Sequence, residues 1–277
     1  MTIIVPTDFS QNANHAVHYA CQLAQSKNMA VHLLHCYTSA SVGDNSTGEE
    51  NLNTLKADQL IIELQNNLLS TFKSLEISVE CSRSLVIDKL TQLSQNGQYA
   101  LIVMGASGAD QLKPLYWGST TVAVASKSEI PVVVIPTEIN QVESNHAALL
   151  TNFKSEELDT LKEYLKLVGS NTHLTLIHVF KENQKQLNIE DALNSWAYNI
   201  REMSNISQVD TVAEPLNKAD DSLDSIPEVV SKIINEVNPS IILITPSRKT
   251  FFKRWFTPSV SKAIALELSK PAFFDKI

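Results

Sequence analysis

The amino-acid sequence contains an internal repeat, which limits the chain to folds that can be built twice. The segment Tyr99–Gly105 (YALIVMG) resembles Pro239–Thr245 (PSIILIT), 140 residues later, and the match needs no gap as far as Pro131. Near the start of each half, Thr7–Phe9 (TDF) resembles Thr151–Phe153 (TNF). A duplicated sequence of this kind predicts two units that share one fold.

The bulk properties of the chain agree with two ordinary globular domains. Hydrophobic residues make up 43% of the 277 residues and charged residues 19%, and either half is long enough to bury a core. We therefore predict a first domain at residues 1–138 and a second at residues 146–277. The polar segment 137–145 (TEINQVESN) is the predicted linker.

Each half follows the same plan of strands alternating with amphipathic helices. This alternation indicates βαβ units and predicts an α/β fold, in which two doubly wound domains each hold a parallel sheet flanked by helices. The purely apolar runs at 100–104 and 241–244 suit strands buried on both faces. The predicted strands are 3–6, 30–36, 76–82, 99–105 and 132–135, then 147–151, 173–179, 207–213, 239–245 and 272–274. The predicted helices are 11–27, 86–96 and 119–127, then 154–168, 226–237 and 258–268.

Several polar stretches are predicted to be solvated. Residues 39–56 are rich in Gly, Ser and Asn and predict a mobile loop, and residues 214–225 predict a second exposed loop. Carboxylate pairs such as Glu156–Glu157 lie in polar sequence and are expected on solvated faces. None of these stretches suggests a catalytic site.

Charge and cysteine content exclude several classes of protein. The formal net charge of −8 argues against broad nucleic-acid binding, because such binding depends on neutralising phosphates. No segment has the length of a membrane span or the pattern of a signal peptide. Three cysteines without a C-x-x-C pair fit reduced thiols, so we expect a cytoplasmic protein. His15 and His18 lack a third metal ligand, and no residue is an evident nucleophile or general base.

A glycine-rich segment carries the strongest chemical signal. Gly105, Gly108 and Gly118 follow a buried strand, and Gly118–Ser119 opens a helix. Glycines let the backbone approach an anion, and the N–H groups at a helix start favour negative charge. The hydroxyls of Ser119, Thr120 and Thr121 are expected to add donors or magnesium ligands. The segment is neither a P-loop nor a G-x-G-x-x-G fingerprint, yet its arrangement favours phosphate binding.

Asp8 follows the first strand and is a second candidate ligand residue. A carboxylate at this edge of a parallel sheet is placed to accept hydrogen bonds from an adenine amino group or a ribose hydroxyl. The alternative is that Asp8 caps the helix that follows, although Ser10 is the better-placed cap. The two roles are compatible.

The spacing Gly-x2-Gly-x9-Gly-Ser, together with Val5–Ser10 (VPTDFS) at the first strand, resembles the universal stress protein family. The resemblance covers both halves and implies a tandem protein with five-stranded sheets in the order 3-2-1-4-5. It also implies ATP, with Mg²⁺ as an option, beside strands one and four of the first half. Carried over by residue, it puts Pro6, Thr7 and Asp8 at the adenine and ribose, Cys36 facing the base, Met104 at the same site, and Gly105, Gly108, Gly118, Ser119 and Thr120 at the phosphates.

The second half departs from this pattern at the ligand positions. Proline removes a backbone donor, and arginine puts a long side chain where a phosphate approaches. We therefore predict that the second half does not bind ATP in the family's manner, although Arg248 as the partner of another anion stays open. The replacements are Thr245 for Gly105, Arg248 for Gly108, Pro258 for Gly118 and Asn152 for Asp8.

The resemblance implies a stress-response regulator, in which ATP or another adenine nucleotide in the first domain changes the shape of the protein or its choice of protein partner. The resemblance also implies that the halves form an intramolecular pseudo-dimer through strands 132–135 and 272–274, with a homodimer as a further option. One rival is slow ATP hydrolysis at the first site, with Asp110 and Lys113 nearby. A second rival is an interaction module whose surface is the basic–aromatic segment 248–256, which otherwise packs over a vacant pocket.

Overall fold

The computed structural model of the chain describes residues 1–38, 47–106, 118–137, 139, 142–143, 145–169, 173–181, 186–217, 226–245 and 270–276. The contacts between residues divide the chain into two compact units. The first unit comprises Met1–Val142 with Lys276–Ile277, and the second comprises Glu143–Asp275. Each unit is a parallel sheet with helices on its faces.

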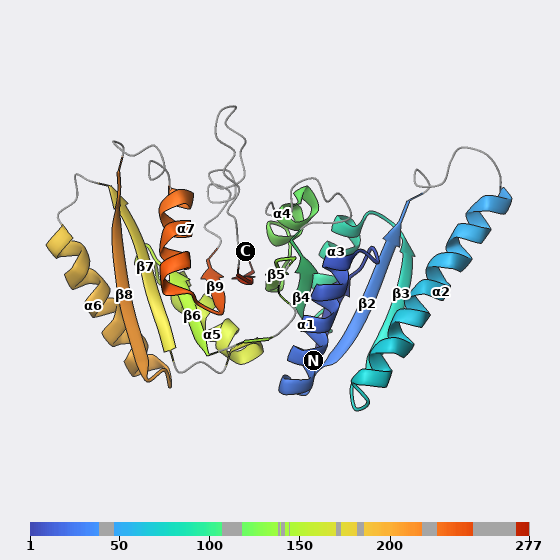
Figure 1. Ribbon diagram of the computed structural model, residues 1–277, viewed down its shortest axis with the longest axis horizontal. Coiled ribbons are helices and arrows are strands. Elements are labelled where there is room, and N and C mark those ends of the chain that lie inside the picture. Colours follow the sequence, from blue (N-terminus) through green and yellow to red (C-terminus); the bar gives the residue numbers. More distant parts are fainter. Residues whose placement is uncertain are drawn as a thin grey trace. The chain divides into compact units, whose positions relative to one another are not determined.

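The first unit has the predicted sheet order. Its strands pair in parallel in the order β3-β2-β1-β4-β5, which confirms the order 3-2-1-4-5 for this half (Figure 1). Its elements are β1 (Thr2–Pro6), α1 (Gln11–Lys27), β2 (Ala30–Tyr37), α2 (Thr47–Thr71), β3 (Ile77–Arg83), α3 (Val86–Ser94), β4 (Tyr99–Gly105), α4 (Ser119–Ala125) and β5 (Val132–Ile135).

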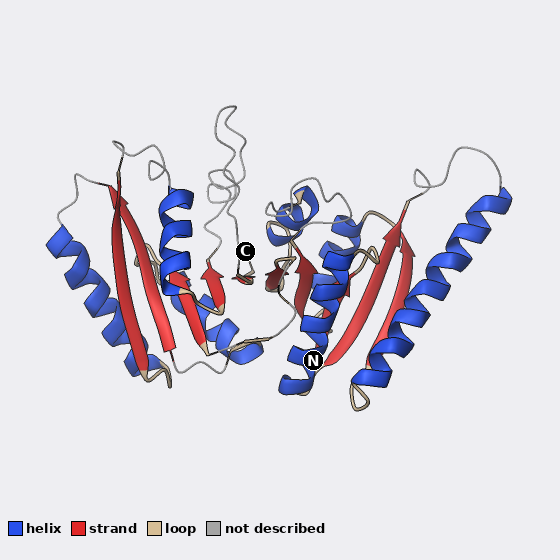
Figure 2. Cartoon of the chain, viewed as in Figure 1, coloured by secondary structure: helices blue, strands red, loops and turns tan. Residues whose placement is uncertain are grey.

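The second unit repeats the same topology. Its parallel strands pair in the order β8-β7-β6-β9-β10, which is again 3-2-1-4-5 when counted along the half. Figure 2 shows the strands of each unit in red and the helices beside them in blue. The helix predicted at 258–268 lies outside the described residues. The elements are β6 (His146–Leu150), α5 (Glu156–Leu167), β7 (His173–Lys181), α6 (Gln186–Met203), β8 (Gln208–Leu216), α7 (Ile226–Val237), β9 (Ile241–Ile244) and β10 (Ala272–Phe274).

The central strands are buried on both faces because the crossovers carry helices to both sides. In the first unit the chain moves outward through β2 and β3 and then reverses to β4 and β5. Right-handed crossovers therefore place α1 and α2 on one face and α3 and α4 on the other. The apolar runs Leu101–Met104 and Ile241–Ile244 are buried throughout, as their composition predicts. Within the described residues, none of the helices has the length and apolar character that crossing a bilayer requires.

Two loop predictions were wrong at their edges. Helix α2 begins at Thr47, so the second part of the predicted loop 39–56 is helical. Its Gly, Ser and Asn content is concentrated before residue 49, and Glu, Leu and Lys after that point favour a helix. Strand β8 continues through Leu216 because Glu214–Leu216 pair with Val179–Lys181 of β7. Pro215 is tolerated there because β8 is an edge strand of its unit.

Candidate functional site

The end of β1 in the first unit is a sharp turn held by side chains. Phe9 has a positive φ of 63°, a conformation that non-glycine residues adopt rarely. The Phe9 N–H donates to Thr7 Oγ1 and the Ser10 N–H donates to Asp8 Oδ1, each at 3.0 Å. Ser10 then caps α1 by accepting from the Ala13 N–H at 3.2 Å. Ser10 is therefore the helix cap, as expected, and Asp8 lies exposed at the edge of the sheet.

A histidine on the neighbouring strand holds this turn in place. His35 Nδ1 donates to the Thr7 carbonyl oxygen at 2.8 Å, and the His35 ring lies 4.6 Å from the Phe9 ring, centroid to centroid. The Thr7 N–H donates to the Leu34 carbonyl at 2.9 Å. His35 therefore has a structural role, because it fixes the backbone that carries Asp8.

The end of β4 and the start of α4 meet close to α1. A Cβ on Gly105 would lie 3.1 Å from the backbone oxygen of Asn12, so a glycine lets β4 approach the first turn of α1. The Gly118 N–H donates to the Ala106 carbonyl at 2.7 Å, which returns the chain to the end of β4. The Thr121 hydroxyl is within 3.1 Å of the Gly105 carbonyl and 3.2 Å of the Ala106 carbonyl. The start of α4 is thereby anchored at the ligand-binding edge of a parallel sheet.

The hydroxyls at this helix start are not equivalent. Thr121 is buried and its hydroxyl bonds the backbone, so the expectation that it presents a donor to a ligand was wrong. Ser119 is exposed and Thr120 is half-buried. The N-cap Gly118 supplies no side-chain oxygen, so the N–H groups of the first turn are left for other acceptors. Gly108, Asp110 and Lys113 lie outside the described residues.

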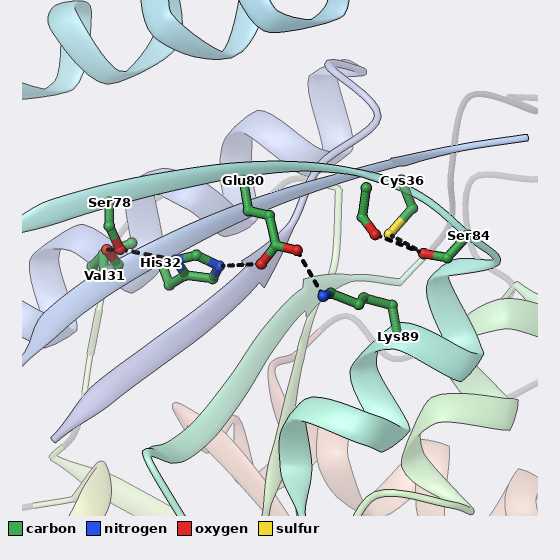
Figure 3. A network of polar contacts seen from close by, with 8 residues as sticks. Val31, His32, Cys36, Ser78, Glu80, Ser84 and Lys89 are labelled. Atoms are coloured by element: carbon green, nitrogen blue, oxygen red, sulfur yellow. Dashed lines mark hydrogen bonds and ion pairs between the residues drawn. The ribbon is translucent and has the colours of Figure 1, made fainter. Parts of the chain in front are cut away.

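Cys36 lies near the end of β2, where the Ser84 hydroxyl donates to its Sγ at 3.8 Å (Figure 3). The thiol is half-buried, and burial raises its pKa, while the bond from Ser84 acts in the opposite direction. A thiol with a raised pKa stays protonated at neutral pH and is a weak nucleophile. Cys36 is therefore suited to a packing contact and not to covalent chemistry.

A separate set of polar contacts joins β2, β3 and α3 (Figure 3). Lys89 of α3 forms an ion pair with Glu80 of β3 at 2.6 Å. His32 of β2 lies 3.3 Å from Glu80 and 2.8 Å from the Ser78 hydroxyl. Burial alone would raise the pKa of the Glu80 carboxyl, but the hydrogen bond and charge of Lys89 lower it. The network ties α3 to the strands beneath Cys36.

Eight of the ten predicted site residues lie at this edge or close to it, at the ends of β1 and β4 and the start of α4. These elements are adjacent because β1 pairs with β4 and Gly118 bonds to Ala106. Cys36 follows on β2, which pairs with β1. The eight are Pro6, Thr7, Asp8, Met104, Gly105, Gly118, Ser119 and Thr120; their roles toward a ligand stay predictions.

The second unit repeats the turn in detail. Phe153 has a φ of 62°, and its N–H donates to Thr151 Oγ1 at 3.0 Å. His178 Nδ1 donates to the Thr151 carbonyl at 2.8 Å, and its ring lies 4.7 Å from the Phe153 ring. The likeness of TDF to TNF in the sequence therefore reflects one shared turn.

A buried carboxylate distinguishes the second turn from the first. Glu157 lies 144 residues after Ala13, the same offset that relates Thr151 to Thr7. Its side chain accepts from the Thr151 hydroxyl and from the Asn152 N–H, the latter at 2.7 Å. Burial raises the pKa of Glu157, and these bonds act in the opposite direction. The expectation of a solvated Glu156–Glu157 pair was wrong for Glu157, which is 3% exposed.

A second buried carboxylate lies where the first unit has an apolar strand residue. The Thr245 hydroxyl donates to Thr160 Oγ1 at 2.9 Å, and Thr160 Oγ1 donates to Asp275 Oδ2 at 3.2 Å. Thr245 is the counterpart of Gly105, and Asp275 is the counterpart of Ile135, each 140 residues later. Asp275 and Ile135 are buried, whereas Thr245 and Gly105 are half-buried. At the corresponding edge, a hydroxyl thus replaces a glycine and a carboxylate replaces an isoleucine. Arg248 and Pro258 lie outside the described residues.

The described residues offer no evident metal centre: no three His, Cys, Asp or Glu side chains among them gather at a distance suited to one ion. His15 and His18 therefore gain no third ligand within that part of the chain.

Comparisons with known proteins give a consistent result. Residues 1–136 match the sequence profile of the Universal stress protein family. A universal stress protein of Methanocaldococcus jannaschii is 28% identical over 151 residues, which cover 48% of this chain and 93% of that relative. A universal stress protein structure from Archaeoglobus fulgidus superposes with a TM-score of 0.71 at 19% identity, covering 99% of this chain and 96% of the other. A putative universal stress protein from Pseudomonas aeruginosa gives 0.59 at 12% identity, with coverage of 99% and 92%. At these identities the two structures show a common fold along the whole chain.

Proposed function

Through its residues 1–136 the chain belongs to the universal stress protein family, and on this basis we propose that its first domain binds an adenine nucleotide. The nucleotide is ATP with Mg²⁺, and its site lies at the ends of β1 and β4. The observation that carries this proposal is that the Asp8 turn and the glycine-bounded start of α4 lie at the ends of two paired strands, β1 and β4. We assign this role to a domain at residues 1–138 and a separate role to a domain at residues 146–277.

The side chains at the site suit the two ends of a nucleotide. The exposed Asp8 carboxylate is an acceptor for a ribose hydroxyl or an adenine amino group, and Cys36 on β2 faces the base. The backbone N–H groups of Ser119 and Thr120 at the start of α4 suit a phosphate. Their hydroxyls add donors or magnesium ligands.

The second domain is suited to a different role. Glu157 and Asp275 bury carboxylates at the edge where the first domain has Ala13 and Ile135. A phosphate entering this edge would meet negative charge, which is unfavourable. We therefore propose that ATP in the first domain regulates which protein partner the chain engages, and that the second domain takes no ATP.

Calorimetric titration of ATP with Mg²⁺ into wild type and two variants at Gly118 tests the proposal. Gly118 has φ −64° and ψ 151°, angles that both proline and alanine adopt. Gly118→Pro removes the N–H that bonds Ala106 and is expected to abolish binding, whereas Gly118→Ala keeps that N–H and is expected to weaken binding less. We expect one site per wild-type chain. Folded wild type that takes up no ATP would overturn the proposal.

A further inference from the structure

A groove on the helical face of the second unit has no part in the proposed nucleotide site. It lies between α5 and the end of α6 and has a volume of about 370 Å³. Five of its lining side chains are apolar, and two carry opposite charges. The apolar ones are Leu158, Leu161, Leu165, Ile200 and Met203, and the charged ones are Lys162 and Glu202.

The first unit has a phenyl ring at the corresponding position. Phe72 directly follows the last residue of α2, and its N–H donates to the Leu68 carbonyl at 2.7 Å. Ser204 directly follows the last residue of α6, and its N–H donates to the Ile200 carbonyl at 3.0 Å. Because the two residues end equivalent helices with the same bond, Ser204 is the counterpart of Phe72.

The Phe72 ring occupies the space between the two helices of its own unit. It is 7% exposed, and its ring lies 6.2 Å from the His18 ring of α1. The counterpart of His18 is Lys162, which follows it by 144 residues and lines the groove. Serine at position 204 leaves this space without a ring.

The apolar lining of the groove remains open to solvent in part. Leu158 and Leu165 are only half-buried, and Met203 is 50% exposed. The first unit has the less apolar Asn14, Cys21 and Thr71 at these positions, so the second unit has become more apolar around the missing ring. Exposed apolar surface is unfavourable in water and gains free energy when a ligand covers it.

We propose that this α5–α6 groove binds a small aromatic molecule whose ring takes the place that the Phe72 ring has in the first unit. A volume of about 370 Å³ lies within the range of small-molecule sites and admits one or two fused rings. Lys162 and Glu202 supply charges of both signs for a polar substituent on the ring. The ligand class is therefore a compact aromatic compound with a polar group, bound within the second unit alone.

Indole, a neutral two-ring probe, tests this proposal by methyl NMR of the full chain. We expect indole to shift the methyl signals of the five apolar lining residues, with a dissociation constant on the order of 0.1–1 mM. Ser204→Phe supplies the ring from the chain itself and is expected to weaken indole binding at least tenfold. Ser195→Phe, at an exposed position on α6, is the matched control and is expected to leave binding unchanged.

A second variant guards against misfolding of Ser204→Phe. Met203→Glu changes a half-exposed side chain of the lining and is expected to weaken indole binding while the rest of the spectrum is retained. The absence of methyl shifts up to the solubility limit of indole would overturn the proposal, and would point to a groove that accepts only a side chain from a protein partner. Shifts that persist in both Ser204→Phe and Met203→Glu would overturn it as well.

Discussion

The two units share the turn after their first strand and differ in what surrounds it. In both, a threonine, a phenylalanine with positive φ and a histidine from the next strand form the same bonds. Around this framework the first unit has Gly105 at the end of β4, and the second unit has Thr245 after β9 with a buried Glu157 beneath the turn. The shared bonds are therefore those needed to fold the turn, and the changed residues are those that a ligand would approach.

Under the proposed function, these changes determine which unit accepts a phosphate. Two like charges 4 Å apart repel by about 4 kcal/mol at the effective dielectric near a protein surface. At such a separation, the ionised carboxylates of Glu157 and Asp275 would oppose a phosphate more strongly than one helix start, at about 1 kcal/mol, would attract it. Burial raises the pKa of Glu157, so a protonated Glu157 would reduce this repulsion at low pH.

The largest expected effect is a difference in unfolding free energy between variants at the two equivalent threonines, Thr151 and Thr7. Thr151→Val removes the hydroxyl that bonds the buried Glu157 and that accepts from Phe153, so we expect a loss of about 3 kcal/mol of unfolding free energy. Thr7→Val removes the acceptor of the single bond from the Phe9 N–H and is expected to cost about 1 kcal/mol. Urea unfolding of both variants measures the difference. Equal losses would show that Glu157 does not depend on Thr151.

A smaller effect on stability is expected when the first unit is given the residue that the second unit has at the end of its fourth strand. Gly105→Thr places a Cβ 3.1 Å from the Asn12 oxygen and adds two further atoms, so we expect about 2 kcal/mol of destabilisation. ATP affinity should fall as well, because the end of β4 would move from α1. Urea unfolding and calorimetry measure the two effects. A variant that keeps wild-type stability and affinity would show that this close approach is not needed.

The smallest effect is a pH dependence confined to the second unit. His146 stacks on His173 with ring centroids 3.7 Å apart, where Asp210 bonds His173 and Thr175 bonds His146. Burial, and then the charge of His173, lower the pKa of His146 below its usual value. As the pH falls, the unfolded chain therefore binds a proton at His146 before the folded chain does. The stability of the folded state is at its full value above about pH 7 and falls as the pH drops through about 6.5.

His146→Thr tests this pH dependence, because Thr2 is the residue at the matching position of the first unit. Hydrogen exchange of β6 and β7, corrected for the intrinsic exchange rate, should speed up between pH 7.5 and 5.5 in wild type. The variant should show a smaller change. An unchanged wild-type profile would contradict the proposed role of His146.

Local repetition explains what the sequence predicted well. The alternation of apolar strands and amphipathic helices predicts the parallel sheets, and the match of Thr7–Phe9 to Thr151–Phe153 predicts the shared turn. His35 and His178 also follow similar apolar strands, whereas their bonds to these turns are seen only in the structure. Each of these signals lies within a short segment or recurs at nearly the same spacing.

Contacts that form only once turns and helices are in place explain what the sequence did not predict. Glu157 looks like a solvated residue at a helix start until the turn brings the Thr151 hydroxyl to its carboxylate. Thr121 looks like a ligand donor until α4 is placed against the carbonyls of Gly105 and Ala106, 16 and 15 residues earlier. The α5–α6 groove appears only when both helices are in place and Ser204 is seen in the position of Phe72.

Hydrogen exchange measured by mass spectrometry, with and without saturating ATP and Mg²⁺, tests the central difference between the units most directly. The method reports on each backbone segment separately. We expect slower exchange in peptides covering 5–13, 104–106 and 118–122, and no change in the matching peptides at 149–157 and 241–245. Protection of the second set, alone or to the same degree as the first, would contradict a single nucleotide site in the first unit.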